Sequence, residues 1–334
     1  MTHHFTPLPW VLAIGLAASS SLILALHAQT GTDEVHITPR SHTSTGRSAG
    51  NASLTGRDSI RVKVNLVLLP VTVTDIMNRP VTGLEKDNFK VFEGKQQQEL
   101  WTFSSEDTPV SLGVIFDTSG SMSTKIDRAR EAVVEFFKAA NPQDEIFMIA
   151  FADKPEELSD FTSSVDDVQG KLLYTIPKGR TALLDAIYTG LSKMKQAKYQ
   201  KKALLIISDG GDNRSRYTEG EIKSLVKETD VLIYGIGIYD QYFQTEEERL
   251  GPQLLEDITQ LTGGRAFTVD DPNDLADVAT KISIELRSQY VLGYKPKGLA
   301  LNGKWHKVKV RLVPPKGLPP LQVHAKAGYY APAE

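Results

Sequence analysis

The chain has 334 residues, of which 40% are hydrophobic and 24% are charged, a content that supports ordinary globular cores and excludes wholesale disorder. At roughly 150 residues per domain, this length predicts about two domains. The 38 basic and 41 acidic residues give a formal net charge of −3, which argues against a nucleic acid or an anionic membrane held by bulk charge. The absence of cysteine excludes disulfides, thiol nucleophiles, thiolate-bound zinc and iron–sulfur clusters.

Residues 1–28 are predicted to be an export segment. Positions 9–26 form an uncharged apolar run, PWVLAIGLAASSSLILAL, which is typical of a signal peptide, and cleavage is expected after Ala28, with Leu26 in place of the usual small residue at the −3 position. The same run is long enough to span a bilayer, so a signal peptide and a membrane anchor both remain open. We therefore expect an exported protein that is periplasmic, cell-surface or secreted, or is tethered to the membrane through residues 9–26.

The next segment, residues 29–57, is predicted to be a disordered linker. It is rich in Ser, Thr and Gly and has almost no large apolar side chains. Such a composition cannot bury enough surface to offset the conformational entropy lost on ordering.

Two β-rich segments lie at the ends of the remaining chain, at 58–108 and 286–334. Apolar and polar residues alternate in IRVKVNLVLLPVTVTD (60–75), and further short strands are expected at 81–84 and 89–95. Near the C-terminus, Val308, Val310 and Leu312 alternate with charged residues. We infer that the C-terminal strands complete the sheet begun at 58–108, so that a small all-β module of sandwich type is discontinuous in sequence.

Residues 109–285 have a different pattern, in which buried strands alternate with amphipathic helices. Apolar runs predict strands, and helical periodicity predicts the segments between them. The expected strands are 110–116, 145–151, 203–208 and 231–238, and the expected helices are 126–140, 182–195, 219–228 and 252–261. This alternation predicts an α/β fold, a doubly wound and mostly parallel sheet that is inserted in the β module.

Oxygen-bearing side chains follow the predicted strands. Asp117, Ser119 and Ser121 come directly after the first strand, Thr181 precedes a helix, and Asp209 follows a later strand. Ligands of open α/β sheets bind at the carboxyl edge, where these residues are expected to meet. Carboxylates and hydroxyls are hard donors that suit Mg²⁺, Mn²⁺ or Ca²⁺ rather than zinc. Each residue alone is more simply explained as a helix cap or a turn, and only their joint occurrence favours a metal site.

This set of residues resembles the metal-ion-dependent adhesion site of von Willebrand factor A domains. The resemblance rests on Asp117-x-Ser119-x-Ser121, on Thr181 in GRTALLDA and on Asp209 in SDGGD, and covers about residues 109–285. The flanking β segments resemble bacterial von Willebrand factor A-related proteins of the acidobacterial type. The resemblance implies that the hydroxyls bind the cation directly, that the two aspartates contribute directly or through water, and that one coordination position accepts an Asp or Glu of a partner protein.

The resulting hypothesis is an exported, metal-dependent protein-binding or adhesion module that is not an enzyme, with Mg²⁺ as the expected cation and Mn²⁺ or Ca²⁺ as alternatives. One alternative is a Mg²⁺-dependent phosphohydrolase with Asp117 as nucleophile. Against it, Ser119 stands where a second acidic residue would be needed. The other alternative is a structural envelope protein with a vestigial metal site.

Overall fold

The computed structural model describes residues 66–209, 211–239, 246–297 and 302–333. The predicted export segment (1–28) and linker (29–57) lie outside these residues. Within the described ranges, no helix combines the length and the apolar character needed to cross a membrane.

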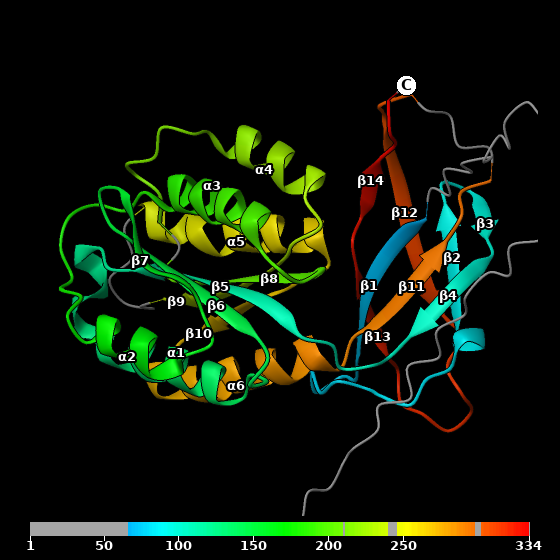
Figure 1. The fold of residues 1–334 in the computed structure, drawn as a ribbon, viewed down its shortest axis with the longest axis horizontal. Helices are drawn as coiled ribbons and strands as arrows, with labels where there is room; N and C mark the ends of the chain where they lie inside the picture. The colour runs from blue at the N-terminus through cyan, green and yellow to red at the C-terminus, as the bar shows by residue number, and fades with distance from the viewer. Residues whose placement is uncertain (1–65, 210, 240–245, 298–301, 334) are drawn as a thin grey trace, which may run out of the picture. The chain divides into compact units, whose positions relative to one another are not determined.

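An open sheet forms the centre of the α/β part (Figure 1). In the described part of the chain it has six strands, in the spatial order β10 (Ala266–Val269), β9 (Leu232–Ile238), β8 (Lys201–Ser208), β5 (Val110–Asp117), β6 (Glu145–Phe151) and β7 (Pro155–Thr162). The pairings from β10 to β6 are parallel, and β7 pairs antiparallel with β6. The predicted doubly wound, mostly parallel sheet is therefore confirmed.

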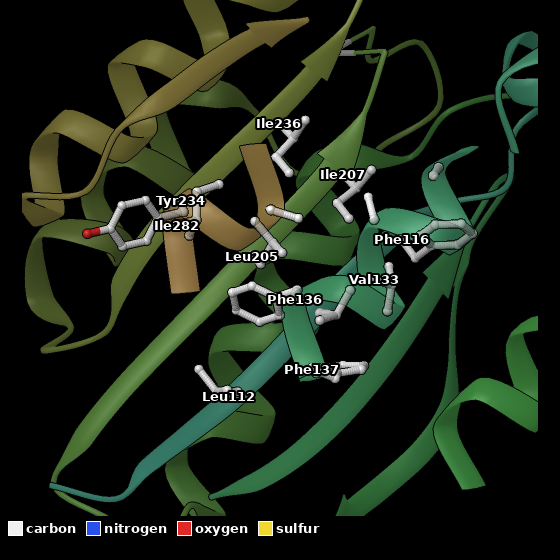
Figure 2. Close-up of a cluster of buried hydrophobic side chains, with 14 of the residues drawn as sticks. Leu112, Phe116, Val133, Phe136, Phe137, Leu205, Ile207, Tyr234, Ile236 and Ile282 are labelled. Atoms are coloured by element: carbon white, nitrogen blue, oxygen red, sulfur yellow. The ribbon is translucent and has the colours of Figure 1, made fainter. Parts of the chain in front are cut away.

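Helices cover both faces of this sheet, so the apolar central strands are buried on both sides. One hydrophobic core contains residues of α1 (Ile126–Lys138), α2 (Val165–Leu172) and α6 (Leu275–Arg287). The core on the other face contains residues of α3 (Leu183–Lys193), α4 (Glu219–Glu228) and α5 (Glu246–Thr262). In Figure 2, Val133 and Phe136 of α1 lie over the sheet beside Leu205. Short 3₁₀ helices are η1 (Lys86–Asn88), η2 (Gly120–Thr124), η3 (Met194–Gln196) and η4 (Pro272–Asp274).

The predicted elements of this part are all present, and two of them, β6 and α4, have the predicted bounds. The α4 helix begins sharply because Thr218 and Glu221 form a reciprocal capping box. Four elements were not predicted: β7, α2, β10 and α6. The sequence of β7, PEELSDFT, is largely polar because this strand lies at the edge of the sheet, where most of its residues are half-buried or exposed, so apolar periodicity does not reveal it.

The β-rich segments form two antiparallel sheets that share one core. Each has four strands within the described residues, in the orders β13 (Gln322–Ala325), β1 (Val67–Thr74), β11 (Tyr290–Tyr294), β4 (Leu100–Ser104), and β14 (Gly328–Tyr330), β12 (Trp305–Leu312), β2 (Phe89–Glu93), β3 (Gln96–Gln98). Strands from opposite ends of the described chain pair directly, β1 with β13 and β2 with β12. Apolar residues of both sheets meet in the shared core, the arrangement of a β-sandwich.

The prediction of a strand at residues 81–84 is wrong. Residues 81–84 form no strand, and an isolated bridge joins the preceding Pro80 to Thr74. The segment is held by a side chain instead, because the buried Tyr290 hydroxyl accepts a hydrogen bond from Leu84 N at 3.0 Å and donates one to Val81 O at 2.9 Å. This contact joins positions more than 200 residues apart in sequence, which local alternation cannot anticipate.

Replacing this hydroxyl tests its role. Tyr290→Phe leaves the Leu84 amide and the Val81 carbonyl without their partner and should lower the free energy of unfolding by about 1–3 kcal/mol, measured by urea denaturation. Tyr330→Phe removes the same atom from a tyrosine that is 40% exposed and should change stability by less than about 0.5 kcal/mol. Equal stability of the two variants would contradict this assignment.

Candidate functional site

The candidate site begins where two neighbouring parallel strands end. Strands β5 and β8 pair in register, with Phe116 opposite Ile207, so Asp117 and Asp209 emerge at the same edge. Both aspartates are buried, at 0% and 1% exposure. Buried carboxylates are rare unless they are paired, hydrogen-bonded or bound to a metal.

The loop after β5 brings three of the predicted residues together. Ser119 N donates to Asp117 Oδ1 at 2.8 Å, and the hydroxyls of Ser119 and Ser121 lie 3.0 Å apart. Ser119 is buried, whereas Ser121 is exposed. Ser119 precedes η2 without making a capping hydrogen bond through its side chain, so the helix-cap explanation of this serine is wrong. The two hydroxyls therefore lie between the buried carboxylate of Asp117 and the solvent, with Ser121 on the solvent side.

Asp209 lies close enough to Asp117 to alter its protonation. Burial, and then the negative charge of Asp209, raise the pKa of Asp117 well above that of an ordinary carboxyl group. Lys125 supplies a compensating charge, with its Nζ 3.8 Å from Asp209 Oδ2 and 3.2 Å from Ile238 O. The site thus combines two buried carboxylates with one nearly buried ammonium group.

Backbone hydrogen bonds of Thr181 and of Gly179 hold this segment beside the loops that follow β8 and β5. Thr181 N donates to Asn213 Oδ1 at 3.0 Å, and its carbonyl accepts from Asn213 N at 3.0 Å. Just before it, Gly179 O accepts from Gly120 N at 3.1 Å, which joins the two loops. Thr181 is buried, and the N-cap of α3 is Ala182, so Thr181 is not a helix cap.

Three further residues complete the site and were missed by sequence reasoning. Ser208 Oγ donates to Asp117 Oδ2 at 2.5 Å from the neighbouring strand. Lys125 pairs with Asp209, and the Tyr239 hydroxyl is buried near Asp209 without a hydrogen-bond partner among the described residues. Burial and the charge of Asp209 both raise the pKa of Tyr239. The sequence could have indicated Ser208 as a site residue, because Ser208 lies at the end of a predicted strand, one residue before Asp209.

The donor set is chemically suited to a hard divalent cation. Asp117, Asp209, Ser119, Ser121 and Thr181 all offer oxygen, and the buried hydroxyl of Tyr239 interacts electrostatically with Asp209. Within the described ranges, no group of three or more His, Cys, Asp or Glu side chains has a metal-binding arrangement. The candidate site is of another kind, in which hydroxyls take the place of further carboxylates.

A second set of hydrogen bonds fixes the loops around the site. Asp185, in the first turn of α3, is 5% exposed and accepts from Arg216 N at 2.8 Å and Tyr217 N at 3.2 Å. Asp212 Oδ2 accepts from Leu184 N at 2.9 Å. These carboxylates therefore tie the loop that follows Asp209 to the helix that follows Thr181.

Known proteins resemble the part of the chain that contains this site. The family model of the von Willebrand factor type A domain matches residues 112–211, a span that includes all five predicted site residues. A curated relative from Borreliella burgdorferi, described as an uncharacterized protein, is 24% identical over 182 residues, which cover 47% of this chain and 53% of that protein. The chain thus spans about half the length of this relative.

Solved structures with a similar fold include a von Willebrand factor type A protein from Catenulispora acidiphila. It is 13% identical with a TM-score of 0.48, and the alignment covers 79% of this chain and 73% of that chain. The PilB minor pilin from Streptococcus sanguinis is 13% identical with a TM-score of 0.45, over 55% of this chain and 63% of that chain. At these levels, neither structure identifies a ligand of this chain.

The loop-fixing role of Asp185 can be measured. Asp185→Ala leaves the amides of Arg216 and Tyr217 without their acceptor and should lower the free energy of unfolding by about 1–3 kcal/mol. Asp277 is a matched control, because it also lies in the first turn of a helix but is exposed. Asp277→Ala should cost no more than about 1 kcal/mol, through the helix dipole alone. Equal losses in urea denaturation would show that Asp185 has no special role.

Proposed function

We propose that this chain is an exported protein-interaction module that binds a divalent cation through Asp117, Ser119, Ser121, Thr181 and Asp209, and through that cation an Asp or Glu side chain of a partner protein. Mg²⁺ is the expected cation, with Mn²⁺ or Ca²⁺ as alternatives. One observation carries the proposal: Asp117 and Asp209 are buried beside each other at the edge of the sheet, and adjoining hydroxyls lead to solvent. A divalent cation would stabilise these carboxylates in their charged form.

The charges of the site support recognition of an acidic partner. Two ionised aspartates and the Lys125 ammonium sum to −1, and a divalent cation would bring the total to +1. The serine and threonine hydroxyls are neutral and do not compensate this remainder. A carboxylate of a partner protein would neutralise the remaining charge of +1. Its attraction to the bound cation is strong because the site is partly desolvated.

The surroundings of Asp117 favour a role in binding over a role in catalysis. Its carboxylate is fully buried, and both oxygens accept hydrogen bonds, from Ser119 N and from Ser208 Oγ. A phosphohydrolase nucleophile would have to contact the phosphorus of its substrate directly with one of these oxygens, whereas a metal ligand can act through a bound water molecule or through a remaining lone pair. We therefore propose that the partner is a protein, and neither a phosphorylated substrate nor a nucleic acid.

The cation can be tested through protein stability. Mg²⁺ at 100 times its dissociation constant should raise the free energy of unfolding of the wild-type chain by about 2.7 kcal/mol, because it binds only the folded state. Asp117→Ala and the similarly sized Asp117→Asn should both abolish this increase. Asp127→Ala, which alters a largely exposed carboxylate in the first turn of α1, should retain it. An unchanged Mg²⁺ effect in both Asp117 variants, or none in the wild type, would overturn the proposed metal site.

The positive charge of Lys125 has a distinct expected effect. It lies 3.8 Å from a proposed metal ligand and therefore opposes binding of a cation. Lys125→Met keeps most of the side-chain volume and should lower the dissociation constant of Mg²⁺ by about tenfold, measured by isothermal titration calorimetry. Lys138→Met, which removes a lysine with 62% side-chain exposure at the end of α1, should leave Mg²⁺ binding unchanged. Weaker binding by Lys125→Met would contradict the proposed charge balance.

A further inference from the structure

The loop between α2 and α3 exposes three large apolar side chains beside the candidate site. Leu173, Tyr174 and Ile176 are 65%, 86% and 72% exposed. Single exposed apolar residues are common, but three within four positions of one loop are a local concentration. We call these three residues the apolar rim.

Hydrogen bonds hold this loop at its start. The guanidinium group of Arg130, on α1, donates to Leu172 O at 3.1 Å through Nε and to the Thr175 hydroxyl at 3.2 Å. It also donates to Thr175 O. The backbone on both sides of Leu173 and Tyr174 is therefore fixed, and their side chains are directed outward by a defined loop conformation.

The end of the loop is bonded to the candidate site itself. Two residues after Ile176, Lys178 N donates to Thr118 O at 2.9 Å, and Gly179 O accepts from Gly120 N. Thr118 and Gly120 alternate with Asp117, Ser119 and Ser121 along the chain. The apolar rim thus borders the loop that carries three of the proposed metal ligands.

Positive side chains accompany the apolar rim. Lys178 and Arg180 are exposed on the same loop, and Arg214 is exposed on the loop that is bonded to Thr181 and Asp185. An acidic segment would therefore meet both favourable charge and apolar surface here. Because apolar contact area contributes most to affinity at the centre of an interface, a large apolar residue next to the acidic one would add to binding.

We infer that the apolar rim selects partner segments in which a large apolar residue lies within a few positions of the Asp or Glu that the cation holds. This inference rests on the proposed function, because it assumes that an acidic side chain is bound at the neighbouring site. Its occupant is an exposed acidic and apolar segment of a partner protein. A segment with small or polar residues around the same acidic residue should bind roughly tenfold more weakly.

The experiment is a selection from a peptide library displayed on phage, with a fixed central Glu and randomised flanking positions, on the immobilised chain in Mg²⁺. A second library with a central Gln measures the need for the carboxylate. The double variant Tyr174→Ser/Ile176→Ser removes most of the apolar rim. The control Ile76→Ser/Met77→Ser alters two apolar residues that are 65% and 68% exposed in the turn after β1. Urea denaturation first establishes that both double variants are as stable as the wild type.

We expect the wild type and the control to select Glu peptides with Leu, Ile, Phe, Tyr or Trp near the Glu. The Tyr174→Ser/Ile176→Ser variant should still select Glu over Gln but lose the preference for apolar neighbours. Glu selection without apolar preference in the wild type, or the same preference in this variant, would overturn the inference and leave the proposed function intact. Equal recovery of Glu and Gln peptides, unaffected by EDTA, would instead overturn the proposed function.

Discussion

The burial of two carboxylates at the ends of adjacent parallel strands is the constraint on which the rest of this edge depends. The register of β5 and β8 places Asp117 and Asp209 there, and neither is open to water. Charged groups in such surroundings must be compensated by hydrogen bonds, opposite charge or a bound cation. The Ser119 amide, the Ser208 hydroxyl and the Lys125 ammonium each supply part of this compensation.

The loops around the carboxylates form a connected frame rather than independent turns. Gly179, at a φ of 80°, adopts a left-handed conformation that few other residues tolerate, and its carbonyl accepts from the loop after β5. Asp185 and Asp212 fasten the loop after Asp209 to α3. The β-sandwich joins the α/β part elsewhere, through the connections from β4 to β5 and from α6 to β11, and Arg287 at the end of α6 pairs with Asp107 and Asp144. Both connections meet β5 or its neighbours at the end that begins with Val110, whereas Asp117 is the last residue of β5.

Much of the fold could be predicted because its strongest signals are local. Continuous apolar runs marked the buried strands, and the bounds of β6 and α4 needed no tertiary information. Elements whose formation depends on contacts with other segments were harder to predict from the sequence. The β7 strand is a polar edge strand, and residues 81–84 are hydrogen-bonded to the Tyr290 hydroxyl instead of pairing as a strand. The D-x-S-x-S spacing marked three site residues, whereas Lys125 carried no such signal, since a lysine before a helix is ordinarily solvated.

By itself the sequence determined the α/β class, the strand ends that carry oxygen donors and the absence of any thiol chemistry. These properties follow from composition and from periodicities of a few residues, which act within one element. Only the tertiary structure decided that Asp117 and Asp209 are buried together, that Ser208 and Lys125 compensate them, and that Leu173, Tyr174 and Ile176 lie exposed on a loop bonded to the same edge. The physical reason is that burial, electrostatic coupling and loop anchoring depend on distances between segments far apart in sequence, and packing across the sheet sets those distances.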